Sequence, residues 1–229
     1  MLERLNLYDI LATIVPGTIL LTVVSALFPR TALPFRGIGF PDEFALVALL
    51  TGAIGAGLFV QTLGSMLEGR FFKVFGGMPS DRALAGNLGG RYLPRDAAKR
   101  VKDALQLRCG PHASPRTLFL HAMSVAESSA DSKAAVFNAQ YGQLRAVFSL
   151  SLLLLVLLSA SRLWGAAATW RAGPFWTVLA LGAILTTLFA WRTWQRGAYY
   201  AREVLLTAAR LLSESSSTST STPSQPSNP

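Results

Sequence analysis

The chain has 229 residues, of which 51% are hydrophobic and only 14% are charged. Soluble domains carry charge on about a quarter of their residues, so this composition excludes an ordinary soluble domain and indicates an integral membrane protein. The net charge of +9 raises nucleic acid as a partner, but membrane topology and attraction to anionic headgroups account for it, and we do not expect nucleic acid to bind.

Four apolar stretches contain no charged residue, and they occupy residues 10–29, 44–67, 146–161 and 172–191. Each is near the ~20 residues that an α-helix needs to cross a hydrocarbon layer of ~30 Å. The sequence therefore predicts an all-α polytopic membrane protein with four transmembrane helices. They form two transmembrane hairpins, within residues 1–67 and 146–212.

Residues 68–145 separate the two hairpins and hold 12 basic and six acidic residues. Excess Lys and Arg remain on the cytoplasmic side when a chain inserts into a membrane. We therefore predict a basic, helical cytoplasmic module here, and a multi-pass inner-membrane protein with both termini in the cytoplasm.

The first stretch contains Pro16 and Gly17 near its middle. Proline removes a backbone donor and glycine weakens the helix, so a kink is predicted at this pair. A cleaved signal peptide is the alternative. Because Glu3 and Asp9 outnumber Arg4 in the leader, we expect the stretch to remain as a span.

The second stretch is rich in glycine, and the candidate helix-packing residues are Gly52, Gly55, Gly57 and Gly64. Small residues let helix backbones approach closely in lipid. This helix is therefore expected to pack closely, either inside the bundle or against another copy of the chain. Gln61 is its main polar side chain and is expected to join two helices by hydrogen bonds.

Within the module, Gly and Pro residues indicate a turn at residues 76–81 and helices at residues 95–108 and 115–129. A long helix is predicted from about residue 131 into the third span. A cytoplasmic helix follows the fourth span to residue 212, where it can join the module. The Ser/Thr/Pro tail, residues 213–229, is expected to be disordered.

A glycine-rich loop, residues 86–91, precedes a basic helix. Its backbone N–H groups and the nearby cations are typical of anion sites, but the Lys-Ser/Thr pair of a P-loop is missing. The favoured interpretation is an interfacial loop that faces anionic lipid or solvent, and a phosphate-bearing ligand such as a nucleotide signal is the alternative. The candidate anion-binding and lipid-binding residues are Arg82, Arg91, Arg95, Lys99, Arg100 and Lys102.

No pattern typical of a catalytic, metal or cofactor site is found. Cys109, His112 and His121 lie near one another in the sequence but lack a fourth zinc ligand. The only candidates for a lipid-acting enzyme are Glu68, Asp81 and His112. We therefore predict a protein that is not an enzyme and needs no cofactor.

The spans contain no ionisable residue, which argues against an ion-coupled transporter. A passive pore remains an alternative, because hydroxyl residues can line one. These residues are Ser149, Ser151, Ser159, Thr186 and Thr187. The competing interpretation is that each hydroxyl bonds to the backbone of its own helix.

Three short motifs carry a resemblance, and they are Tyr8-Asp9 with Pro16-Gly17, Gly76-Gly77-Met78-Pro79-Ser80, and Phe137-Asn138-Ala139-Gln140-Tyr141 with Arg145. In these the chain resembles a family of uncharacterised small bacterial four-span membrane proteins. Its general plan is also similar to that of membrane subunits of phage-defence systems. Neither likeness assigns a role to any residue.

Together these observations predict a non-enzymatic membrane sensor, effector or scaffold that forms homo-oligomers. Its basic module would dock a cytoplasmic protein partner, anionic lipid or a nucleotide signal. The alternative is a passive channel or a transporter subunit.

Overall fold

The computed structural model describes residues 7–27, 42–129, 133–163 and 172–218. Every regular element in these ranges is an α-helix, and they contain no strand, which confirms the all-α prediction. The chain divides into two compact units. The apolar unit comprises residues 1–71 and 139–195, and the module unit comprises residues 72–138 and 196–229.

The apolar unit is built from α1 (Leu7–Leu27) and from the apolar parts of α2 (Asp42–Val74), α6 (Ala134–Leu163) and α7 (Ala172–Thr218). The last three are long and apolar enough to cross a membrane. The apolar part of α1, Ala12–Leu27, is shorter. Three candidate spans are thus present in the described residues, and the fourth stays a prediction.

These helices are longer than the apolar stretches that predicted them. α2 has 33 residues, α6 has 30 and α7 has 47, which correspond to about 50, 45 and 70 Å at 1.5 Å per residue. The tail was predicted to begin at residue 213, which is wrong, because α7 continues to Thr218. Residues 219–229, and the predicted start of α6 near residue 131, lie outside the described residues.

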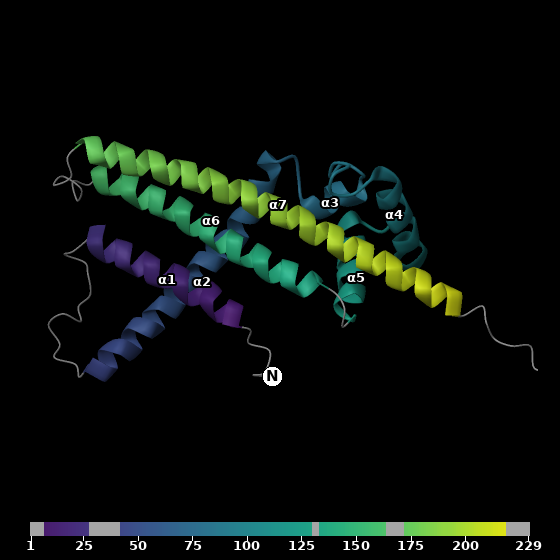
Figure 1. Ribbon diagram of the computed structural model, residues 1–229, viewed down its shortest axis with the longest axis horizontal. Coiled ribbons are helices and arrows are strands. Elements are labelled where there is room, and N and C mark those ends of the chain that lie inside the picture. Colours follow the sequence, from purple (N-terminus) through teal and green to yellow (C-terminus); the bar gives the residue numbers. More distant parts are fainter. Residues whose placement is uncertain (1–6, 28–41, 130–132, 164–171, 219–229) are drawn as a thin grey trace, which may run out of the picture. The chain divides into compact units, whose positions relative to one another are not determined.

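α1 and α2 cross where their backbones touch (Figure 1). A Cβ atom at Gly17 would overlap the carbonyl oxygen of Ala53, and one at Gly57 would overlap the carbonyl oxygen of Thr13. Both glycines are buried. α1 continues as a helix through Pro16, so the observed role of the neighbouring Gly17 is close packing, and the kink stays a prediction.

Gln61 joins the same two helices, which confirms its predicted role. Its Nε2 donates hydrogen bonds to Thr13 Oγ1 at 2.8 Å and to the Ala12 carbonyl at 3.3 Å. An amide that lacks a partner at membrane depth is expensive, so these bonds fix the register of the crossing.

The other glycines of α2 differ in their surroundings. A Cβ at Gly64 would lie 2.8 Å from Ser149 Oγ of α6, and one at Gly52 would lie 3.4 Å from Leu21 of α1. Gly55 faces open space. Three of the four glycines therefore pack inside the chain, and Gly55 alone of the four is available to an external neighbour.

The module unit contains α3 (Pro79–Leu84), α4 (Arg95–Cys109) and α5 (Pro115–Glu127), which pack on one another. The predicted turn at residues 76–81 is shorter than expected, because α3 begins at Pro79. Gly76 and Gly77 have φ of +83° and +112° and make this turn. Ser114 caps α5 by accepting a hydrogen bond from the Thr117 N–H, and Pro115 occupies the first position of the predicted helix.

The C-terminal part of α7 belongs to the core of the module unit. Leu205 of α7 is fully buried, as are Leu105 of α4 and Leu118 of α5. The rings of Tyr92 and Tyr199 meet edge to face at 5.2 Å, and those of Phe119 and Tyr200 at 6.1 Å. The helix after the fourth apolar stretch thus packs into the module, as predicted.

We predict that Gly57→Val lowers the free energy of unfolding of the apolar unit by about 1–3 kcal/mol or more. The added side chain meets the backbone of Thr13 in α1, which cannot move aside. Unfolding in detergent micelles titrated with sodium dodecyl sulfate measures the effect. Gly55→Val is the matched control, since Gly55 faces open space in the same helix. Equal stability of the two variants would contradict the crossing.

Candidate functional site

A row of exposed cations lies on and just before α4. The helix buries Ala98, Val101 and Leu105 against the rest of the module unit. The exposed remainder of its surface carries the cations Arg95, Lys99 and Arg100 together with the carboxylates of Asp96 and Asp103. Because Arg95 and Lys99 are four residues apart, they lie on one face of the helix.

Two further cations extend this row. Arg91 is exposed just before the helix, and Lys102 is half-buried within it. α4 begins after Pro94 and ends at Cys109, where Gly110, with φ of +96°, stops it. We use the name basic face for the cations of this segment, Arg91, Arg95, Lys99, Arg100 and Lys102, which are distributed around the exposed surface of α4 and the residues before it. It holds five of the six predicted anion-binding residues.

Arg82, the sixth, has a structural role. Its Nη1 donates to the Phe75 carbonyl at 2.5 Å and its Nη2 to the Asn87 carbonyl at 3.0 Å. These bonds tie the turn before α3 to the loop after it. Such charge-assisted bonds hold the guanidinium in place, so we leave Arg82 out of the basic face.

Two N–H groups of the glycine-rich loop, and two just after it, donate to carbonyl groups of the module unit. Gly86 donates to the Ala83 carbonyl and Asn87 to the Arg82 carbonyl, at 3.1 and 2.8 Å. Tyr92 and Leu93 both donate to the Gly89 carbonyl. A phosphate cradle needs free N–H groups that converge on one point. The site is therefore better described as a charged surface than as a nucleotide cradle.

The thiol and imidazole residues come from different parts of the module unit. Cys109 ends α4, His112 is exposed in the following loop, and His121 lies in α5. Within the described ranges, no three His, Cys, Asp or Glu side chains gather closely enough to hold a metal ion.

A polar cluster that the sequence analysis did not identify joins α2 to α6 in the apolar unit. Arg145 Nη1 donates to Glu68 Oε2 at 2.5 Å, and the two side chains are 26% and 21% exposed. The same guanidinium lies 5.6 Å from the centre of the Tyr141 ring. Glu68 directly follows the second apolar stretch and Arg145 directly precedes the third. These opposite charges at the ends of two stretches are the sequence feature from which the ion pair could have been predicted.

The five hydroxyl residues considered as pore lining all bond to their own helices. Ser149, Ser151 and Ser159 donate to carbonyl groups three or four residues earlier in α6. Thr186 and Thr187 do the same in α7. These side chains therefore have their donors satisfied without water.

Comparisons with protein-family models, with curated proteins and with solved structures found no match for the chain.

We predict that Arg145→Gln lowers the free energy of unfolding by about 1–3 kcal/mol, because it leaves the Glu68 carboxylate largely buried without its cation. A double-mutant cycle with Glu68→Gln in micelles should give a coupling energy of about 0.5–3 kcal/mol. The control is Glu214→Gln, whose partner Arg210 lies 4.0 Å away in an exposed pair. Its expected effect is within about 0.5 kcal/mol. A coupling energy near zero would contradict the contact.

Proposed function

We propose that the chain is a non-enzymatic membrane scaffold or sensor with four spans, both termini in the cytoplasm, and a module that docks on anionic lipid. In this proposal it resides in a bacterial inner membrane, in keeping with its resemblance to small four-span proteins. The observation that carries the proposal is the continuity of α7, whose apolar part belongs to one unit and whose C-terminal part is packed into the other.

The basic face supports the choice of anionic lipid as the partner. Its cations project from a packed helix whose other side is buried. Each Lys or Arg near an anionic membrane surface contributes about 1 kcal/mol of attraction. A nucleotide is less favoured, because two N–H groups of the loop, those of Gly86 and Asn87, already donate to the Ala83 and Arg82 carbonyls.

The alternative of a passive channel receives less support. A water-filled pore requires side chains that offer hydrogen bonds to its contents. The hydroxyl groups of the third and fourth apolar stretches donate to their own helices instead. The lipid-acting enzyme is also less favoured, because the Glu68 carboxylate is paired with Arg145.

Self-association remains part of the proposal, but fewer glycines are available for a contact between two copies. Gly17, Gly57 and Gly64 are used in packing within the chain. An external contact of the glycine-rich face would therefore centre on Gly55, beside the exposed side chains of Ile54, Leu58 and Phe59.

Cysteine labelling tests the number of spans. We expect Asn6→Cys and Ser213→Cys, each in a Cys109→Ser background, to resist a membrane-impermeant maleimide in spheroplasts and to react after permeabilisation. With three spans and a cytoplasmic module, Asn6→Cys alone would react in intact spheroplasts. The control is the chain without substitutions, in which labelling of Cys109 reports on which side of the membrane the module lies.

Lysine acetylation in nanodiscs tests the docking of the module. We expect Lys99 to react more slowly in discs that contain phosphatidylglycerol than in phosphatidylcholine discs, because anionic headgroups attract the basic face. The difference should decline at high salt. Arg95→Gln with Arg100→Gln should weaken docking by about 2 kcal/mol, roughly 30-fold.

Lys133 is the internal control, because it is exposed and lies outside the basic face. Equal reactivity of Lys99 in both kinds of disc would contradict lipid docking. Protection of Lys99 in neutral discs by added nucleotide would favour the nucleotide alternative instead.

A further inference from the structure

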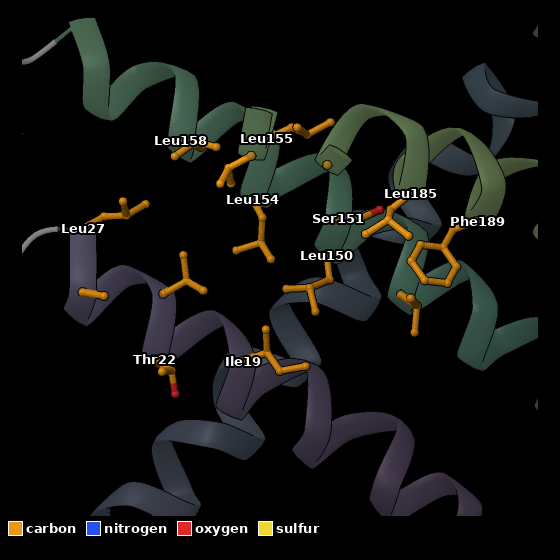
Figure 2. A pocket seen from close by; sticks show the side chains of 15 residues that line it. Ile19, Thr22, Leu27, Leu150, Ser151, Leu154, Leu155, Leu158, Leu185 and Phe189 are labelled. Atoms are coloured by element: carbon orange, nitrogen blue, oxygen red, sulfur yellow. The ribbon is translucent and has the colours of Figure 1, made fainter. Parts of the chain in front are cut away.

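The apolar unit contains a groove of about 560 Å³ between α1, α6 and α7. In Figure 2, Leu150 and Leu154 of α6 point toward α1, and Ile19 of α1 points back toward them. Leu185 and Phe189 line it from α7. Its volume lies within the ~300–1,000 Å³ that is usual for small-molecule sites.

The groove presents an almost wholly apolar surface. Two hydroxyl residues, Thr22 and Ser151, are part of its lining. Thr22 Oγ1 donates to the Thr18 carbonyl and Ser151 Oγ to the Phe148 carbonyl, both at 2.8 Å. Neither hydroxyl requires a hydrogen bond from an occupant, so a hydrocarbon can fill the groove without leaving a buried polar group unsatisfied.

One end of the groove carries a cation. Leu158 lines this end from α6, and Arg162 follows it by four residues and thus lies on the same face of the helix. The Arg162 guanidinium stands 5.6 Å from the ring centre of Phe175 in α7. Val178, one turn after Phe175, lines the groove. Arg162 of α6 therefore lies beside α7 at this end of the groove.

We propose that the groove binds an acyl chain of an anionic glycerophospholipid, with the phosphate group at Arg162. The apolar walls hold the chain by van der Waals packing, since bilayer hydrocarbon is as apolar as the groove and no hydrophobic driving force acts between them. The guanidinium provides bidentate, charge-assisted contacts to the phosphate. This inference rests on the proposed membrane embedding, and it adds a specific lipid site to it.

Two features favour a lipid over a helix from a second copy. A helix is ~10 Å wide with its side chains, so it would cover the groove rather than enter it. A neighbouring apolar helix also offers no anion to Arg162, whereas a phospholipid supplies hydrocarbon and phosphate in one molecule.

Lipid retention by the full chain tests the proposal. The protein is exchanged into an equal mixture of phosphatidylglycerol and phosphatidylcholine, purified in mild detergent, and its bound lipid is measured by native mass spectrometry. We expect about one retained lipid per chain, with phosphatidylglycerol preferred. Leu158→Trp should lower retention about tenfold by filling the groove, equivalent to about 1.4 kcal/mol.

Arg162→Gln separates the roles of the two parts of the site. This variant should still retain a lipid but should lose the preference for phosphatidylglycerol. The control is Leu181→Trp, because Leu181 is 55% exposed on α7 and lies outside the lining. If Leu158→Trp fails to fold, Leu158→Phe makes a smaller change at the same position.

Three results would overturn the proposal. They are an unchanged lipid preference in Arg162→Gln, equal retention in the two tryptophan variants, and a dimer that dissociates on Leu158→Trp, which would assign the groove to a second copy. Cysteine labelling measures the membrane embedding independently. If one of these results is obtained while cysteine labelling still indicates four spans, the groove site is rejected and the proposed membrane embedding is not.

Discussion

The thickness of a hydrocarbon layer is the constraint on which the proposed arrangement depends. At ~30 Å, the layer accommodates about 20 helical residues, whereas α2, α6 and α7 have 33, 30 and 47. In the proposed arrangement each helix extends beyond the layer, and the extensions have different partners. The extra length of α2 and α6 holds Glu68 and Arg145, which pair with each other. The extra length of α7 supplies Leu205 to the core of the module unit.

The parts of the fold that depend on local chemistry could be predicted from the sequence. Ser114-Pro115 started a helix and Gly110 ended one, because capping and backbone conformation involve neighbouring residues. Gln61 was expected to bridge two helices, since an amide among apolar residues needs a partner. The cations of the basic face were visible as a basic helix after the glycine-rich loop, and their role in binding stays a prediction.

The parts that depend on contacts between distant residues could not be predicted. Glu68 and Arg145 are 77 positions apart, and either charge alone is consistent with a solvated helix end. Arg82 was assigned to anion binding because its charge is visible in the sequence, whereas the carbonyl groups that it contacts are not. The extension of α7 to Thr218 was missed for a related reason. Ser and Thr favour disorder by composition, but they can continue a helix that is already formed, because only its nucleation is unfavourable.

The bond between Gln61 and Thr13 has a consequence for the order in which the chain assembles during synthesis. α1 leaves the ribosome before α2, so Thr13 and the backbone at Ala12 are already present when Gln61 arrives. The free-energy cost of burying the Gln61 amide is therefore offset by hydrogen bonds within the first hairpin, before α6 and α7 are synthesised. The contact also stabilises α1 in the proposed membrane. The apolar part of α1, Ala12–Leu27, is short, and its close packing on α2 keeps it there. On the proposed embedding, α1 and α2 can therefore pair first, and α6 then completes the core that Leu20 and Val60 share with Ala146 and Leu150.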